Sequence, residues 1–134
     1  MIDIENEIYS EIASAVSEEM PGASLSGEYV KAPPKFPHAS IIEADNSTYA
    51  RTRTGERGEN HAIVMYEVNV YSNKRTGKKA ECRKLLDIID RRMIEMGFSR
   101  MMMNAVPDLY DATIYRLVAR YQAVVSLNHK IYRV

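Results

Sequence analysis

The sequence predicts an α/β (α+β) fold, in which two amphipathic helices pack on one face of a mixed, mostly antiparallel sheet. Apolar residues recur at helical spacing in residues 3–20 and 78–96, and they alternate at strand spacing in residues 62–71 and 113–126. Turn-forming residues such as Pro21-Gly22 separate these segments. The predicted order is α-β-β-α-β-β-β. Because both helices are expected on one face of the sheet, the other face is left uncovered.

Each predicted helix has a single apolar stripe. The stripe of the first helix consists of Ile4, Ile8, Ile12, Val16 and Met20. The stripe of the second helix consists of Cys82, Leu85, Leu86, Ile89, Met93 and Met96. On the polar side of the second helix, Asp87 and Arg91 are spaced to form an ion pair, and Gly97 is placed to cap the C-terminus.

The two long predicted strands each have one apolar face and one mixed face. The apolar faces contain Ala62, Val64, Tyr66, Val68, Val70, Tyr115, Leu117, Ala119, Tyr121, Ala123 and Val125. The mixed faces contain Met65, Glu67, Asn69, Tyr71, Ile114, Arg116, Val118, Arg120, Gln122 and Val124. Such a mixture is too polar for a second core, yet it has more apolar residues than a purely solvated strand face needs. Shorter strands are predicted at 38–46, 98–104 and 130–134, with a short extended segment near 24–30.

Length, composition and charge favour one globular domain spanning residues 1–134. The chain has 134 residues, of which 46% are hydrophobic and 27% charged, and this is enough for one core. Lys and Arg number 18, as do Asp and Glu, and this balance argues against binding DNA irrespective of sequence. No apolar run approaches the ~20 residues of a membrane span, and the N-terminus lacks a secretory pattern. We therefore expect synthesis in the cytosol, no membrane contact and no specific nucleic-acid partner.

No spacing of residues predicts a catalytic site, a metal site or a cofactor. His38, His61 and His129 are not spaced as metal ligands, and we expect each to be a solvated or loop histidine. Cys82 lies on an apolar stripe, where a thiol behaves as a small hydrophobic group. The basic cluster Lys74–Lys79 could hold an anion at a helix N-terminus, but without a glycine-rich phosphate loop a solvated cluster is the simpler interpretation.

Candidate contact residues lie on the mixed strand face, in a methionine run and in a charged loop. Arg116 and Arg120 share one face, where they either pair with a cross-strand residue such as Glu67 or form ion pairs with another subunit. The run of methionines suits an adaptable interface or ordinary core filling, and consists of Met101, Met102 and Met103. The loop at about 50–60 is predicted to be a mobile arm, either solvated or ordered against a partner. Its candidate contact residues are Arg51, Arg53 and Arg57.

Residues 36–74 and 97–125 resemble a family of small proteins from long-tailed bacteriophages and prophages, the tail terminator or minor capsid (head–tail joining) proteins. The most specific pieces are ENHAIVMYEVNVYSNK at 59–74 and the pair DATIYR and RY within 111–121. The likeness extends from about Phe36 to Val134, whereas the N-terminal helix is generic.

The resemblance implies a structural role in the virion rather than an enzymatic one. Tail terminators form a ring, commonly hexameric, that caps the finished tail tube and presents a surface to the head connector. The implied partners are further copies of this chain, the major tail tube protein and a head connector or head-completion protein, with no cofactor. The implied fold is a mixed α/β sheet with helices on one side. Related phage assembly proteins share this general fold, so a head-closure or joining role is the alternative.

Two other classes of function are less favoured by the residues. A nucleic-acid-binding module would use Arg51, Arg53, Arg116 and Arg120, but the balanced charge counts against it. A small-molecule enzyme would use the basic cluster Lys74–Lys79, but no convergent polar groups accompany it. In the favoured assembly role, the 50–60 arm and the sheet edge are expected to supply contacts between different patches of neighbouring subunits.

Overall fold

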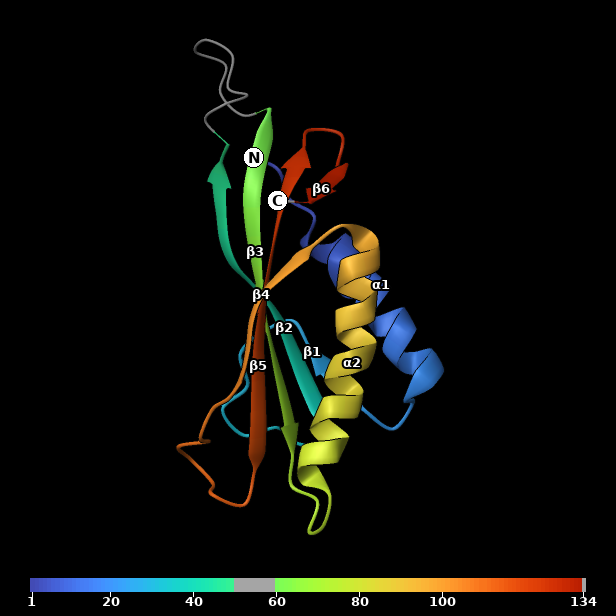
Figure 1. Cartoon of the computed structure of the whole chain (residues 1–134), viewed down its shortest axis with the longest axis vertical. Coiled ribbons are helices and arrows are strands. Elements are labelled where there is room, and N and C mark those ends of the chain that lie inside the picture. The colour runs from blue at the N-terminus through green and yellow to red at the C-terminus, as the bar shows by residue number, and fades with distance from the viewer. Residues whose placement is uncertain (50–59, 134) are drawn as a thin grey trace.

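The structure, a computed structural model, describes residues 1–49 and 60–133. Helices α1 (Glu5–Glu19) and α2 (Lys78–Met96) lie side by side on one face of a six-stranded sheet (Figure 1). The strands are β1 (Ser24–Ser26), β2 (His38–Thr48), β3 (His61–Ser72), β4 (Ser99–Ala105), β5 (Tyr115–Ser126) and β6 (Ile131–Arg133). This arrangement confirms the predicted α+β fold. The three-residue strand β1 is added to the predicted order, within the segment where a short extended piece was expected.

The sheet has the strand order β1-β2-β3-β5-β4, and β6 also pairs with β5. Strand β3 pairs with β5 along its whole length, so β4 and β6 share the other edge of β5. The β1–β2 pair is parallel, and the pairs β2–β3, β3–β5, β4–β5 and β5–β6 are antiparallel. The sheet is therefore mixed and mostly antiparallel, as the sequence predicts.

The core lies between the sheet and the two helices. The apolar stripes of both helices and the apolar faces of β3 and β5 are buried there, except that Met20, Met96 and Tyr115 are partly exposed. The Tyr66 ring meets the Phe98 ring edge-on, with centroids 5.6 Å apart. Burial raises the pKa of Tyr66, and the charge of the Glu43 carboxylate, which accepts a hydrogen bond from the Tyr66 hydroxyl at 3.3 Å, raises it further. The Tyr66 ring therefore packs in the core on the helix side of the sheet.

Helix α2 ends as predicted at Gly97. This glycine has a φ of 110°, and the N–H of Phe98 bonds to the carbonyl of Met93 at 3.0 Å. A Cβ at position 97 would also lie 3.1 Å from the Ile131 side chain of β6. Only glycine meets both conditions without strain, so it fixes the close approach of α2 to β6. The predicted ion pair on α2 is present, with Arg91 Nε 3.1 Å from Asp87 Oδ2.

His38 corrects one sequence prediction, because it is buried rather than solvated. Its side chain is 3% exposed at the start of β2, where its ring nitrogens lie 2.7 Å from Ser24 Oγ and 3.0 Å from Ser26 Oγ. Both serines come from β1, which pairs in parallel with the start of β2. Burial lowers the pKa of His38. The histidine is therefore a structural anchor that joins β1 to the rest of the sheet.

Candidate interaction surface on the uncovered sheet face

The candidate site is the face of the sheet opposite the helices, here called the outer face. Residues directly opposed in antiparallel strands point to the same side, so the pairing register assigns each side chain to a face. Its residues in β2 to β5 are His38, Ser40, Ile42, Asp45, Ser47, His61, Ile63, Met65, Glu67, Asn69, Tyr71, Ser99, Met102, Asn104, Arg116, Val118, Arg120, Gln122, Val124 and Ser126. Figure 1 shows the sheet nearly edge-on, with both helices on the other side.

Arg120 and Glu67 form an ion pair at the centre of the outer face. They are directly opposed in β5 and β3, and Arg120 donates from Nε to Glu67 Oε1 at 3.0 Å and from its terminal nitrogen at 2.9 Å. The Arg120 side chain is 49% exposed and that of Glu67 is 22% exposed. The prediction that Glu67 would pair across the strands is confirmed for Arg120. A contact of this pair with another subunit stays a prediction.

Asn69 extends the pair into a polar chain along β3 and β5. Its amide nitrogen donates to Glu67 Oε2 at 3.0 Å, and its carbonyl oxygen accepts from Arg116 Nε at 3.0 Å and Nη2 at 2.7 Å. The Arg116 guanidinium also lies 5.9 Å from the centroid of the Tyr71 ring. These hydrogen bonds hold the side chains of Arg116 and Arg120 at defined positions on the outer face.

Half of the outer face is covered, which corrects the prediction that the whole face is open. Asn69 is 0% exposed, Tyr71 2% and Val118 6%. The β1–β2 and β4–β5 connections run on this side of the sheet (Figure 1), and they meet where Lys31 Nζ lies 4.6 Å from the Tyr110 ring centroid. Burial also raises the pKa of Tyr71. These two connections carry no periodic pattern, so their position over the sheet could not be predicted from the sequence.

The other half of the outer face is open and partly apolar. Beside the Arg120–Glu67 pair lie four half-buried apolar side chains from three strands, namely Ile42, Ile63, Met65 and Val124. The apolar residue that β2 adds to this face was predictable from the sequence, because the consecutive residues Ile41 and Ile42 must face opposite sides of a strand. An apolar surface beside one exposed ion pair resembles the composition of a protein–protein interface.

The methionine run divides between the two faces of β4. Met102 opposes Arg120 on the outer face, and Met103 opposes Ala119 on the helix side, where it packs against the core. Met101 lies at a register shift between Arg100 and Met102 and is 53% exposed. The run therefore fills the core at Met103 and is accessible at Met101, and a role of the run in an interface stays a prediction.

Cys82 and the basic cluster Lys74–Lys79 are both in contact with other parts of the chain. Cys82 is 0% exposed among core residues, and burial raises the pKa of its thiol to about 12, which confirms its place on the buried stripe. In the basic cluster, Lys74 Nζ lies 3.9 Å from Glu81 and Lys78 Nζ donates to the Thr113 carbonyl at 3.1 Å. Anion binding at this cluster stays a prediction.

His61 and His129 lie near the ends of the sheet. The His61 ring is half-buried and stands 5.7 Å from the Tyr132 ring centroid, so it is less solvated than predicted. His129 is exposed as predicted, and its Nδ1 lies 2.6 Å from Glu7 Oε1 of α1. Among residues 1–49 and 60–133, no three His, Cys, Asp or Glu side chains are grouped to hold a metal ion.

Three predicted contact residues lie outside the described residues, as does most of the predicted arm; they are Arg51, Arg53 and Arg57.

Within the described part of the chain, neither helix is long and apolar enough to cross a membrane. Comparison with protein-family models and with curated proteins gives no match to this chain.

Proposed function

We propose that this chain is a non-enzymatic phage tail assembly protein, which forms a ring that caps the tail tube and provides the surface for head attachment. The observation that carries the proposal is the open half of the outer face. There, the half-buried Ile42, Ile63, Met65 and Val124 lie beside the partly exposed Arg120–Glu67 pair. A subunit that binds neighbours through a sheet face needs this combination of apolar area and oriented charge.

The sheet edges support contact through side chains rather than through strand addition. Strand β1 has only three residues, and β4 is interrupted by the register shift at Met101. Short and irregular edge strands are poor templates for pairing with another chain. A sheet with blunted edges and an open face therefore favours association through the face.

The arginines favour an assembly role over nucleic-acid binding. Arg120 is paired with Glu67, and Arg116 donates two hydrogen bonds to Asn69. Binding a phosphate would require each guanidinium to give up or share these partners. Balanced charge over the chain, 18 basic and 18 acidic residues, points the same way.

Electron microscopy of particles assembled without this protein tests the proposal. The gene would be disrupted in the phage or prophage that encodes it, and a plasmid copy would serve as the complementation control. We expect overlong tails without heads, beside filled heads without tails. Tails of normal length that fail to join heads would instead indicate the joining role. Normal, infectious particles would contradict both roles.

A further inference from the structure

The first two turns of α2 and the turn before them form a strongly basic surface. Residues 73–84 contain six Lys and Arg side chains against one carboxylate, whereas the charges of the whole chain are balanced. That carboxylate, Glu81, is already bonded: it accepts from Ser72 Oγ at 2.7 Å and lies 3.9 Å from Lys74 Nζ. The six cations, here called the basic end, are Lys74, Arg75, Lys78, Lys79, Arg83 and Lys84.

Four members of the basic end have no acidic partner in the described part of the chain. Arg75, Lys79, Arg83 and Lys84 are exposed. Among residues 1–49 and 60–133, no carboxylate forms an ion pair with any of them. Because Lys79 and Arg83 are four residues apart on a helix, their charges also repel each other. An acidic surface placed on the basic end would therefore relieve an unfavourable charge interaction.

The basic end projects beyond α1 in the layer that the two helices form, here called the helix layer. The last residue of α1, Glu19, pairs with Arg91, so α1 does not extend over the first turns of α2. Figure 1 shows the start of α2 at the lower end of the molecule, below the end of α1. The charged side chains of these turns are therefore accessible to another molecule.

The rest of the helix layer is acidic. Residues 1–20 contain six carboxylates and no Lys or Arg. A groove of about 290 Å³, here called the acidic groove, lies between α1 and the second half of α2. Its charged lining consists of four carboxylates and two arginines, namely Glu11, Glu18, Glu19, Glu95, Arg91 and Arg92.

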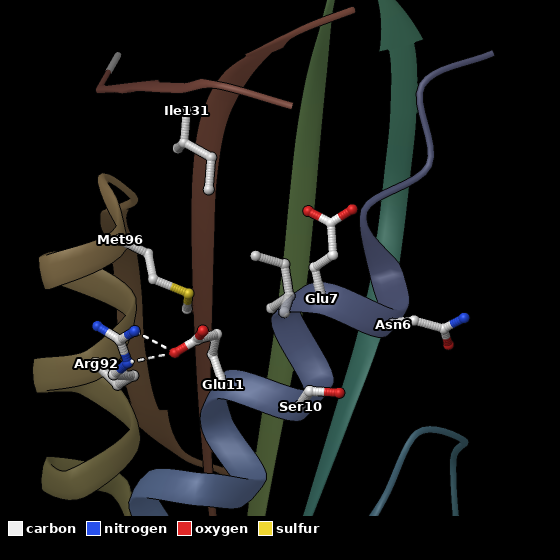
Figure 2. Close-up of a pocket in the computed structure, with 8 residues that line it drawn as sticks. Asn6, Glu7, Ser10, Glu11, Arg92, Met96 and Ile131 are labelled. Atoms are coloured by element: carbon white, nitrogen blue, oxygen red, sulfur yellow. Dashed lines mark hydrogen bonds and ion pairs between the residues drawn. The ribbon is translucent and has the colours of Figure 1, made fainter. Parts of the chain in front are cut away.

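The two arginines do not neutralise the acidic groove. Arg92 forms ion pairs with both Glu11 and Glu95, and Figure 2 shows its bonds to Glu11 across the seam between the helices. Arg91 likewise has two carboxylate oxygens, 2.9 Å and 3.1 Å from its guanidinium nitrogens. Glu18 forms no ion pair among the described residues. The groove therefore keeps a net negative charge, which suits a cationic side chain.

The basic end and the acidic groove follow each other along α2. Lys84 lies on the same stripe of α2 as Ile88, Arg91 and Glu95, which line the groove. At about 1.5 Å per residue, the centres of the two surfaces lie roughly 15 Å apart along the helix. A two-fold axis between them therefore sets two copies antiparallel, with the basic end of each on the groove of the other. Both contacts form at once, and the pair is closed.

We infer that two copies of this chain pair through their helix layers, with the basic end of each copy on the acidic groove of the other. The inference goes beyond the proposed function and does not depend on it, because the outer face lies on the opposite side of the sheet (Figure 1). The pair thus leaves the open half of the outer face accessible to a further partner.

Charge exchange between two variants of the full chain tests this contact. The first variant, Lys79→Glu with Arg83→Glu and Lys84→Glu, makes the basic end acidic. The second, Ser14→Lys with Glu18→Lys, makes the lining of the groove cationic. In sedimentation velocity at about 0.05 M NaCl, the unmodified chain should dimerise, and each variant alone should do so about tenfold or more weakly. An equimolar mixture should restore a 1:1 dimer, since both contacts then join opposite charges.

The controls separate this contact from general charge effects and from misfolding. Lys35→Glu, on the exposed β1–β2 connection, should leave dimerisation unchanged. Raising NaCl to about 0.5 M should weaken the unmodified dimer about tenfold. Glutamate near the start of α2 and lysine near the end of α1 both suit the helix dipoles, so the variants should keep their helices. Circular dichroism checks this.

The possible outcomes decide the inference separately from the proposed function. A chain that stays monomeric at about 0.05 M NaCl up to its solubility limit would overturn the inference, as would a mixture that restores no dimer. Oligomers that both variants form unchanged would overturn it too, and would leave the proposed function standing. If the monomeric chain binds a short DNA duplex and the first variant does not, the occupant of the basic end is a nucleic acid and not a second copy. In each case the particle phenotype still decides the proposed function.

Discussion

The two faces of the sheet are built from the same strands in the same register, yet they differ in composition and in cover. On the helix side, Val64, Tyr66, Val68, Ala119 and Tyr121 are all 0% exposed. On the outer face, the residues between them form a polar chain with apolar neighbours, and half of it is open. The helix side holds the fold together, whereas the outer face combines local stability with a surface for a partner.

Neighbouring isoleucines of β2 provide the sharpest test of this difference. Ile41 is 2% exposed on the helix side, and Ile42 is half-buried beside Glu67 on the outer face. Ile41→Ala should lower the free energy of unfolding by about 2–5 kcal/mol, since it leaves a cavity in the core. Ile42→Ala should cost about 1 kcal/mol or less, and urea denaturation measures both.

These two variants are matched controls for each other. The substitution, the strand and the loss of strand propensity are the same, so only the face differs. Ile42→Ala should weaken self-association or partner binding more than it weakens folding. Equal losses of unfolding free energy would show that the outer face near Ile42 is packed like the core.

The second largest effect is expected in the covered half of the outer face. Asn69→Ala removes the acceptor of both Arg116 bonds and the donor to Glu67. We expect a loss of about 1–3 kcal/mol in unfolding free energy, because Arg116 would lose its partner in a partly buried setting. Asn104→Ala, at an exposed outer-face position of β4, should change it by less than about 0.5 kcal/mol. Similar small losses in both variants would mean that the polar chain is not a stabilising network.

The sequence predicted the regular elements better than the covering connections. Helix α2 was predicted with its observed ends, because a long apolar stripe and Gly97 define both the period and the cap. The alternation in β3 and β5 likewise placed their core residues correctly. Periodicity is a local signal, and it is strongest where one face of an element is entirely buried.

His38, Asn69 and Tyr71 were misjudged because their burial depends on distant segments. Two serines of β1 enclose His38, and the β1–β2 and β4–β5 connections cover the outer face near Asn69 and Tyr71. Those connections contain proline, aspartate and lysine without a repeating pattern. No local rule states where such a segment will lie. The pocket lined by Ile8, Met96 and Ile131 was also missed, because it exists only where α1, α2 and β6 meet.

The pH dependence of stability should report on His38. Burial lowers the pKa of His38 from 6.5 in the folded chain, so below pH 6.5 the unfolded chain binds more protons. The free energy of unfolding therefore falls as the pH drops through 6.5 toward the lowered pKa. His38→Asn should flatten this slope in urea denaturation curves taken at a series of pH values.

Glu43 gives a pH dependence of opposite sign and serves as the internal comparison. Burial, followed by the charge of Glu5, raises the pKa of Glu43 above its ordinary 4.5. The folded chain then binds more protons, so the unfolding free energy falls as the pH rises above 4.5. Glu43→Gln should remove that slope and leave the one due to His38. An unchanged slope below pH 6.5 in His38→Asn would assign that dependence to other groups.

The smallest effect on folding should come from the open half of the outer face. A double-mutant cycle of Glu67→Gln and Arg120→Gln should give a coupling of about 0.2–1 kcal/mol in unfolding free energy, because the pair is partly exposed. High salt should reduce it further. Other contacts of Glu67, including its bond from Asn69, largely cancel in the cycle.

The same cycle has a second readout that the folding measurement cannot give. If a partner covers the outer face, the Arg120–Glu67 pair loses its water, and removal of one member leaves the other charged and buried. Each single variant should then weaken association by more than its effect on folding, and the double variant should recover part of the loss. Association constants that do not change in any of the three variants would exclude this half of the face from the interface. The open apolar surface around the pair would then be an ordinary half-exposed sheet face, and the contrast between the two faces would concern stability alone.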